Sequence, residues 1–177
     1  STWQSAFSTI AVTQGKWYCE RKFESGQDVM LGIVKESSAT NSFTAGSNYP
    51  GINSGGYGYY EPDGNLYNNG SASSYGNSYT TGDIIGIAVD LDNNYLYFSK
   101  NGTFQNSGDP TSGATGTGGI DISSITSEPI YIASGHWKTV SGTTKTFSNF
   151  GNPPYSANGY SDANGYGNMS YSVPSGY

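Results

Sequence analysis

The sequence predicts an all-β fold, an antiparallel β-sandwich or barrel, on three observations. Gly, Ser, Asn and Thr make up 85 of the 177 residues, and these residues prefer turns or extended backbone to helix interiors. Polar and apolar residues alternate with a period of two wherever a pattern is clear. Turn signals separate many short strand-like runs. The 16 Tyr, 7 Phe and 3 Trp exclude a disordered chain, because disordered segments are poor in aromatic residues.

Two strands are expected near the amino end, followed by a long polar segment. Residues 15–23 alternate, and one face is predicted to be buried: Trp17, Cys19 and Phe23. The other face is predicted to be solvated: Tyr18, Glu20 and Lys22. Residues 29–34 form a short apolar run, typical of a second strand. Residues 36–56 are too polar to pack and are predicted to be a loop.

The segment 81–104 is predicted to be a three-stranded antiparallel meander. Residues 84–89 are apolar and rich in β-branched side chains, typical of a buried strand. Asp92-Asn93-Asn94 predicts a turn, and Asn101-Gly102 predicts a tight hairpin turn because both residues accept positive φ. Beyond a loop at 107–119, two strands are expected at 129–135 and 144–150, separated by a loop at 136–142. A further short strand is expected at 167–171.

Composition also limits the class of function. The net charge of −6 and pI near 4.4 repel phosphate, so no nucleic-acid partner is expected. No apolar run approaches the ~20 residues of a membrane span, so no membrane insertion is expected. The length favours a single domain. The first residue, Ser1, suggests a processed product or a piece of a longer protein.

Catalytic and metal-binding residues are sparse, and no enzyme, metal or cofactor is predicted. The sequence has a single histidine, His136, and lacks the Gly-x-Ser-x-Gly motif that would supply a serine nucleophile for it to activate. One His with one Cys cannot hold zinc. Glu20 and Glu24 have the spacing of a glycosidase pair on a strand, but Lys22 between them favours a charge-paired surface. Asp90 and Asp92 precede a turn, where Asp commonly accepts backbone hydrogen bonds. The calcium-loop pattern that starts at Asp90 fails at its Gly and Glu positions.

A recognition surface fits the composition better than an active site does. Tyr supplies large, rigid contact area at low entropic cost, while Ser, Gly and Asn supply adaptable hydrogen bonds. This mixture is concentrated in three segments of the chain: 41–60, 67–79 and 155–177. The alternative is that these tyrosines only line a Gly-rich sandwich.

The order of motifs resembles the SPRY (B30.2) family. The matching segments, in chain order, are 15–20 (GKWYCE), 30–33 (MLGI), 57–59 (YGY), 64–70 (GNLYNNG), 82–92 (GDIIGIAVDLD), 97–102 (YFSKNG), 129–134 and 149–151 (NFG). The resemblance implies a concanavalin-like, bent antiparallel β-sandwich over residues 1–151, with 152–177 as a Gly/Tyr/Ser-rich extension packed on or continuing the same domain. It also implies a non-enzymatic module that recognises protein segments through loops at one edge. The ligand-binding candidates at that edge are Trp137, His136, Tyr49, Tyr59 and Tyr60.

The tail from 158 onward resembles the segment that follows SPRY modules in bacteriophage structural proteins. This resemblance implies a module on a virion or extracellular surface that binds a host protein segment or surface glycan and contacts other virion proteins. Two alternatives stay open: a cellular SPRY module that binds protein partners, and a concanavalin-like hydrolase that acts on a polysaccharide.

Overall fold

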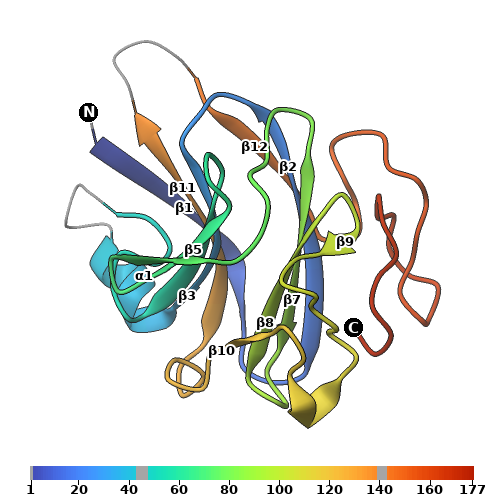
Figure 1. Cartoon of the computed structure of the whole chain (residues 1–177). Helices are drawn as coiled ribbons and strands as arrows, with labels where there is room; N and C mark the ends of the chain where they lie inside the picture. The colour runs from blue at the N-terminus through green and yellow to red at the C-terminus, as the bar shows by residue number, and fades with distance from the viewer. Residues whose placement is uncertain (1, 43–47, 139–142) are drawn as a thin grey trace. The chain divides into compact units, whose positions relative to one another are not determined.

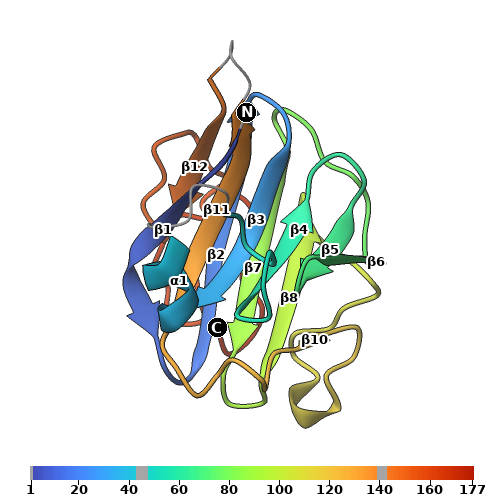
Figure 2. The same cartoon turned by 90° about the vertical axis from the view of Figure 1, so that its left-hand side faces the viewer.

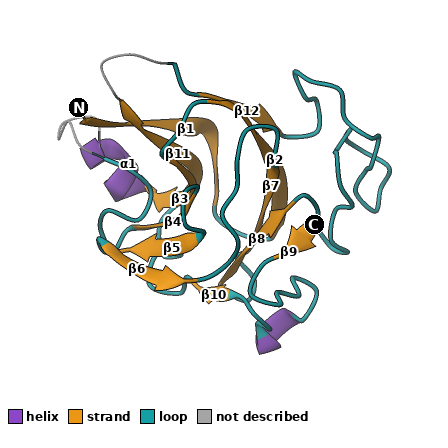
Figure 3. Ribbon diagram, turned by 45° about the horizontal axis from the view of Figure 1, so that its top comes forward, coloured by secondary structure: helices purple, strands orange, loops and turns teal. Residues whose placement is uncertain are grey.

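The structure is a computed structural model that describes residues 2–42, 48–138 and 143–177. Strands account for nearly all of its regular secondary structure (Figure 3). The chain divides into two compact units. Unit 1 comprises Ser1–Thr13, Ser25–Thr80 and Ser123–Thr144, and unit 2 comprises Gln14–Glu24, Thr81–Ile122 and Lys145–Tyr177. The all-β class predicted from the sequence is confirmed.

Unit 1 is built on a six-stranded antiparallel sheet (Figure 1). Its strands, in spatial order, are β1 (Thr2–Val12), β11 (Ile130–Lys138), β3 (Val29–Lys35), β4 (Gly56–Tyr60), β5 (Asn65–Asn68) and β6 (Ser71–Ser74). One face of the central strands is apolar and buried; it includes Val29, Leu31, Ile33, Ile132 and Tyr59. This burial holds β3 and β11 in register, because a slip of one residue would turn these side chains to the opposite face.

A short helix, α1 (Glu36–Ser42), covers part of the other face of this sheet. Ala39 packs with Val34 and Ala133, and Phe7 and Tyr131 lie against them; Figure 2 shows α1 against β11 and β3. The prediction of a loop over residues 36–56 is therefore wrong for its first seven residues. The sequence does not indicate the helix because its residues are polar or small: among its described side chains, Ala39 makes the apolar contact and Ser38 is also buried.

The first turn of α1 is held by Glu128. Its carboxylate accepts hydrogen bonds from Lys35 Nζ at 2.6 Å and from the Ser37 backbone N–H at 2.8 Å. These bonds lower the pKa of Glu128 to about 2, with the Lys35 bond as the largest cause. A carboxylate at this position is favourable because the first N–H groups of a helix have no partner within the helix.

Unit 2 is built on a second antiparallel sheet. Its strands, in spatial order, are β10 (Ile120–Asp121), β8 (Tyr95–Lys100), β7 (Ile84–Asp90), β2 (Lys16–Ser25) and β12 (Lys145–Asn149), and β9 (Thr103–Phe104) pairs with β8. A 3₁₀ turn, η1 (Gly113–Thr115), interrupts the loop before β10.

The predicted meander is confirmed as β7, β8 and β9. The Asp90 carboxylate accepts hydrogen bonds from the backbone N–H groups of Asp92 and Asn93, which closes the first turn as expected for Asp. At the second turn, Asn101 and Gly102 have φ angles of 50° and 81°. Positive φ at both positions matches the two-residue hairpin turn that Asn-Gly favours.

The prediction for the two faces of β2 is only partly correct. Cys19 and Phe23 are buried, as expected, but Trp17 is 49% exposed and Glu20 is completely buried. The carboxylate of Glu20 accepts the backbone N–H groups of Ser170 and Tyr171 and the side-chain amide of Asn149. These donors replace water around the charge. Glu20 is therefore not part of a solvated ladder, whereas Lys22 and Glu24 do form an ion pair at 2.8 Å.

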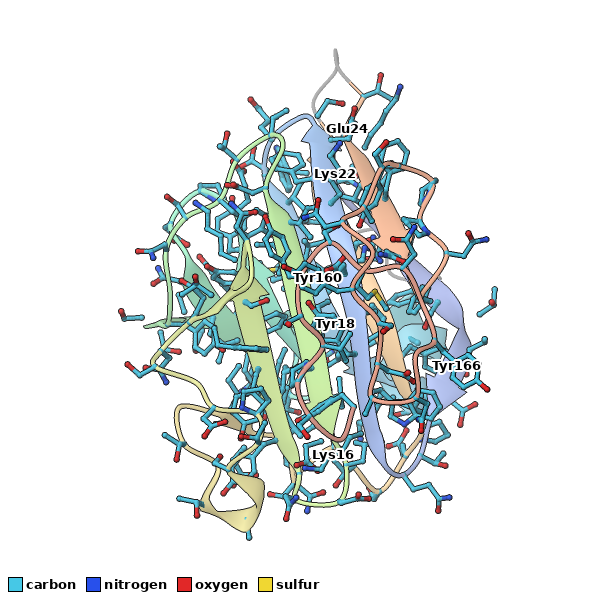
Figure 4. The ribbon with its side chains drawn as sticks, turned by 90° about the vertical axis from the view of Figure 1, so that its right-hand side faces the viewer. Lys16, Tyr18, Lys22, Glu24, Tyr160 and Tyr166 are labelled. Carbon is cyan, nitrogen blue, oxygen red and sulfur yellow. The ribbon has the colours of Figure 1, made fainter. Side chains whose placement is uncertain are left out.

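The C-terminal segment lies across β2 in unit 2. In Figure 4, Lys16 and Lys22 lie near opposite ends of the strand and the segment crosses between them. Each lysine also faces a ring of this segment at 5.4 Å, Lys16 with Tyr177 and Lys22 with Tyr155. Residues 167–171 do not form the expected strand. A single antiparallel bridge between Tyr160 and Met169 takes its place.

No helix in the described part of the chain is both long enough and apolar enough to cross a membrane.

Replacing Glu20 with Ala tests the contact that holds the C-terminal segment. The change leaves two backbone N–H groups and the Asn149 amide without their acceptor, so we expect the free energy of unfolding to fall by about 3 kcal/mol or more. Glu24→Ala on the same strand removes a partly exposed ion pair and should cost at most about 1 kcal/mol. Urea unfolding of both variants measures the difference. Equal losses would contradict this role of Glu20.

A second prediction concerns acid stability. Burial alone would raise the pKa of Asp90, but hydrogen bonds from Lys16 and Asn93 hold it below its ordinary value of 3.8. A lowered folded-state pKa contributes stability above the unfolded-state value, and this contribution is lost as pH falls through the folded-state value. Asp90→Asn should therefore be less stable than the native chain at neutral pH, and the gap should narrow below about pH 4. Urea unfolding from neutral to strongly acidic pH measures it; parallel curves would show that Asp90 makes no such contribution.

Candidate functional site

Five aromatic side chains form a partly exposed cluster on unit 1, which we call the aromatic patch. It consists of Trp3, Tyr49, Tyr60, Tyr67 and Trp137. The Trp3 ring is central: its centroid lies 4.6 Å from that of Tyr49, 5.9 Å from Trp137 and 6.0 Å from Tyr60. Tyr67 completes the cluster, 5.4 Å from Tyr60 and 6.2 Å from Tyr49. These separations are typical of interacting aromatic pairs.

The register of the sheet brings four of these rings to one face. Trp3 on β1 is directly opposite Trp137 on β11. Tyr60 on β4 is opposite Met30, and Tyr67 on β5 is opposite Gly58. Because paired residues share a face and neighbouring residues alternate, these four side chains project from the face that α1 covers elsewhere.

The fifth ring reaches the patch through a loop that lies directly on the sheet backbone. At Gly135 a Cβ atom would stand 2.8 Å from Cβ of Tyr49 and 3.2 Å from Cδ of Pro50. At Gly58 it would stand 2.1 Å from the Pro50 carbonyl oxygen. The Ser5 hydroxyl also donates a hydrogen bond to the Asn48 carbonyl. Two glycines on the sheet thus permit the close approach that sets Tyr49 against Trp3.

Asp28 links the strands beneath the patch. Its φ is 55°, a left-handed conformation that Asp and Asn tolerate better than most residues. Its carbonyl accepts the Trp137 backbone N–H at 3.1 Å, and its own N–H donates to Oε2 of Glu61 at 2.9 Å. Its Oδ1 accepts the Tyr60 hydroxyl at 2.8 Å. One residue therefore fixes both the backbone at Trp137 and the orientation of the Tyr60 ring.

The electrostatics keep the phenols of the patch protonated. Burial, followed by the hydrogen bond and charge of Asp28, raises the pKa of Tyr60. Burial also raises the pKa values of Tyr49 and Tyr67. Burial likewise raises the pKa of Glu61, while hydrogen bonds from the backbones of Asp28 and Val29 oppose this effect. The patch therefore offers neutral hydroxyl groups and aromatic rings beside carboxylates.

The structure brings together three of the five residues predicted from the sequence: Tyr49, Tyr60 and Trp137. It separates the other two, because neighbours on a strand face opposite sides. β11 extends into the predicted loop as far as Lys138, and the rest of that loop, 139–142, lies outside the described residues. His136 lies on the face of β11 opposite Trp137 and pairs with Val29. Tyr59 has no exposed surface, and its hydroxyl donates to the Asn77 carbonyl. Tyr59 belongs to the core and is removed from the candidate surface.

Sequence reasoning missed Trp3, Tyr67 and Asp28. Trp3, Ser5 and Phe7 alternate in β1, which is a weak strand signal that could have placed Trp3 on a sheet face. Tyr67 begins the segment 67–79, whose composition favoured a recognition surface, but it was not among the ligand-binding candidates. The role of Asp28 depends on its contacts with the ends of β4 and β11, which are distant from it in sequence.

The residue types considered for chemistry have other roles. Glu20 is enclosed by hydrogen-bond donors of the chain and Glu24 is paired with Lys22, so the glycosidase spacing is used structurally. Burial raises the pKa of the Cys19 thiol to about 12, which disfavours the reactive thiolate. Among the described residues, no three His, Cys, Asp or Glu side chains gather as a metal site.

Comparison with known proteins places this geometry in a family. The SPRY domain model matches residues 16–120. Ran-binding protein 9 of Danio rerio and of Homo sapiens are each 37% identical to the chain over 95 residues, 52% of its length. The match spans only 15% and 12% of those two proteins. A Ran-binding proteins 9/10 homolog of Drosophila melanogaster is 43% identical over 54 residues, 30% of this chain and 6% of that protein.

Solved structures agree with the sequence comparison. The SPRY domain of human HERC1 covers 82% of this chain and 81% of its own, with a TM-score of 0.60 and 18% identity. A second human SPRY domain covers 75% of this chain and 77% of its own, with a TM-score of 0.53 and 17% identity. This likeness confirms the predicted SPRY-like β-sandwich. The chain belongs to the SPRY domain family.

Proposed function

We propose that this chain is a non-enzymatic protein-interaction module that binds a segment of a partner protein at the aromatic patch. The observation that carries the proposal is the patch itself: five partly exposed rings from β1, β4, β5, β11 and one loop, held by Asp28. Membership of the SPRY family, whose modules mediate protein interactions, supports the same function.

The physical properties of the patch suit a contact surface. Trp and Tyr dominate binding hot spots because they bury large area on association and lose little conformational entropy. Here the rings are already positioned by the sheet register and the two glycines, so little ordering is needed when a partner binds.

Among the functions considered from the sequence, the relatives favour the cellular interaction module over the phage virion module. They are animal proteins, although the chain spans a small part of each. The names of those relatives refer to binding of Ran. We do not extend that partner to this chain. Location on a virion or extracellular surface, with host glycans and virion proteins as partners, is a second proposal, supported by the Gly/Ser/Asn/Tyr-rich loops. The gene neighbourhood tests it: genes for capsid or tail proteins would support it, and cellular genes would overturn it.

Trp137→Ala tests the proposed surface. Short random peptides are selected on the immobilised chain, and the affinity of the enriched peptide is measured by fluorescence polarisation. We expect Trp137→Ala to weaken binding by about 2 kcal/mol, roughly 30-fold in Kd, the size of a hot-spot truncation.

Trp17→Ala is the matched control, since Trp17 is an exposed tryptophan on β2 in unit 2. It should leave Kd unchanged. Equal affinity of Trp137→Ala and the native chain, with both folded by circular dichroism, would overturn the aromatic patch as the binding surface.

A further inference from the structure

We propose that the aromatic patch receives a basic side chain, Arg or Lys, from the partner segment. This inference rests on the proposed function and adds the chemical class of the group that is recognised. It is carried by two features that coincide in unit 1: the aromatic rings of the patch, and a set of carboxylates beside them that form no ion pair with a described Lys or Arg.

Three carboxylates, which we call the acidic rim, lie beside the patch. Asp28 accepts the Tyr60 hydroxyl at 2.8 Å, and Glu61 accepts the Asp28 backbone N–H at 2.9 Å. The charge of Asp63 acts on the phenols of both Tyr60 and Tyr67, and its carboxylate accepts the Asn65 backbone N–H. Asp28 directly precedes β3, and Glu61 and Asp63 follow the end of β4. The acidic rim is therefore held by turns that adjoin the strands of the same sheet as the rings.

No described Lys or Arg side chain forms an ion pair with the acidic rim. Within unit 1, the described Lys or Arg side chain is Lys35, and it pairs with Glu128 at 2.6 Å beside α1. Ion pairs with lysines of unit 2 neutralise Asp90, Glu24 and Asp83. Among the described side chains, no Lys or Arg therefore neutralises the acidic rim beside the aromatic patch.

The rings supply the second half of the recognition. A cation within about 6 Å of a Trp or Tyr face is attracted by the ring quadrupole. The interplanar angles between neighbouring rings of the patch lie between 46° and 84°. The rings are therefore not stacked in parallel, face against face. A guanidinium group can stack on such a face while its N–H groups reach a neighbouring carboxylate.

Other partner chemistries suit this surface less well. An acidic segment would meet the acidic rim and the net charge of −6, both of which repel it. A purely apolar side chain would cover the carboxylates and remove water from them without providing a counter-charge, which is costly.

The test uses the full chain and the peptide enriched by selection from short random sequences. We expect Arg or Lys at one position of the enriched peptide. Replacing that Arg by citrulline, which keeps the shape and removes the charge, or that Lys by norleucine, should raise Kd about tenfold. The affinity should also fall as salt is increased, because exposed charges are screened.

The protein side is tested with a variant that neutralises the acidic rim, Asp28→Asn/Glu61→Gln/Asp63→Asn. Each change keeps the oxygen that accepts the hydrogen bond described above, and Asn at position 28 tolerates the positive φ. This variant should bind the enriched peptide about tenfold more weakly. The matched control, Asp92→Asn/Asp109→Asn/Asp162→Asn in unit 2, removes the same total charge and should leave Kd unchanged.

The outcomes separate this inference from the proposed function. Two results would overturn the inference of a basic side chain even if Trp137→Ala still weakened binding. One is enrichment of apolar or acidic residues in the selected peptide, and the other is equal affinity for the peptide and its neutral analogue. Equal weakening by the two charge-neutralising variants would show general electrostatic attraction and would also overturn it. If no peptide distinguishes the native chain from Trp137→Ala, the proposed function itself fails.

Discussion

The candidate site depends on the hydrogen bonds of one residue, Asp28. Its carbonyl accepts the Trp137 N–H at the end of β11, while its N–H and its carboxylate bind Glu61 and Tyr60 at the end of β4. Asp28 makes these bonds with a left-handed φ of 55°, a conformation that Asp tolerates better than most residues. Without this residue the ends of β4 and β11 would lack a common partner, and the two rings they carry would lose their shared support.

Strand alternation explains which of the predicted binding residues gather and which do not. The family resemblance implied one loop edge for His136, Trp137, Tyr59 and Tyr60. In a strand, neighbours face opposite sides, so each pair is divided between the aromatic patch and the opposite face. The meander, the burial of Cys19 and the turn at Asp90 were predictable, since local alternation and turn chemistry determine them.

The features that were not predictable depend on contacts between distant parts of the chain. Glu20 lies 150 positions from Ser170, and a single sequence gives no sign that a carboxylate between Cys19 and Arg21 will be enclosed by backbone donors. The same holds for Trp3 and Trp137, which meet only through the pairing of β1 with β11. Helix α1 was missed because its polar sequence makes its buried contact mainly through Ala39.

The way Glu20 holds the C-terminal segment determines which substitutions in this segment leave its attachment intact. Two of its donors, at Ser170 and Tyr171, are backbone N–H groups, which every residue except proline supplies. The bonds to Glu20 at these two positions therefore depend on the path of the main chain and only weakly on which side chains stand there. The exposed side chains of Tyr160 and Tyr166 take no part in these bonds, so the chemistry of this surface can change while the attachment is kept.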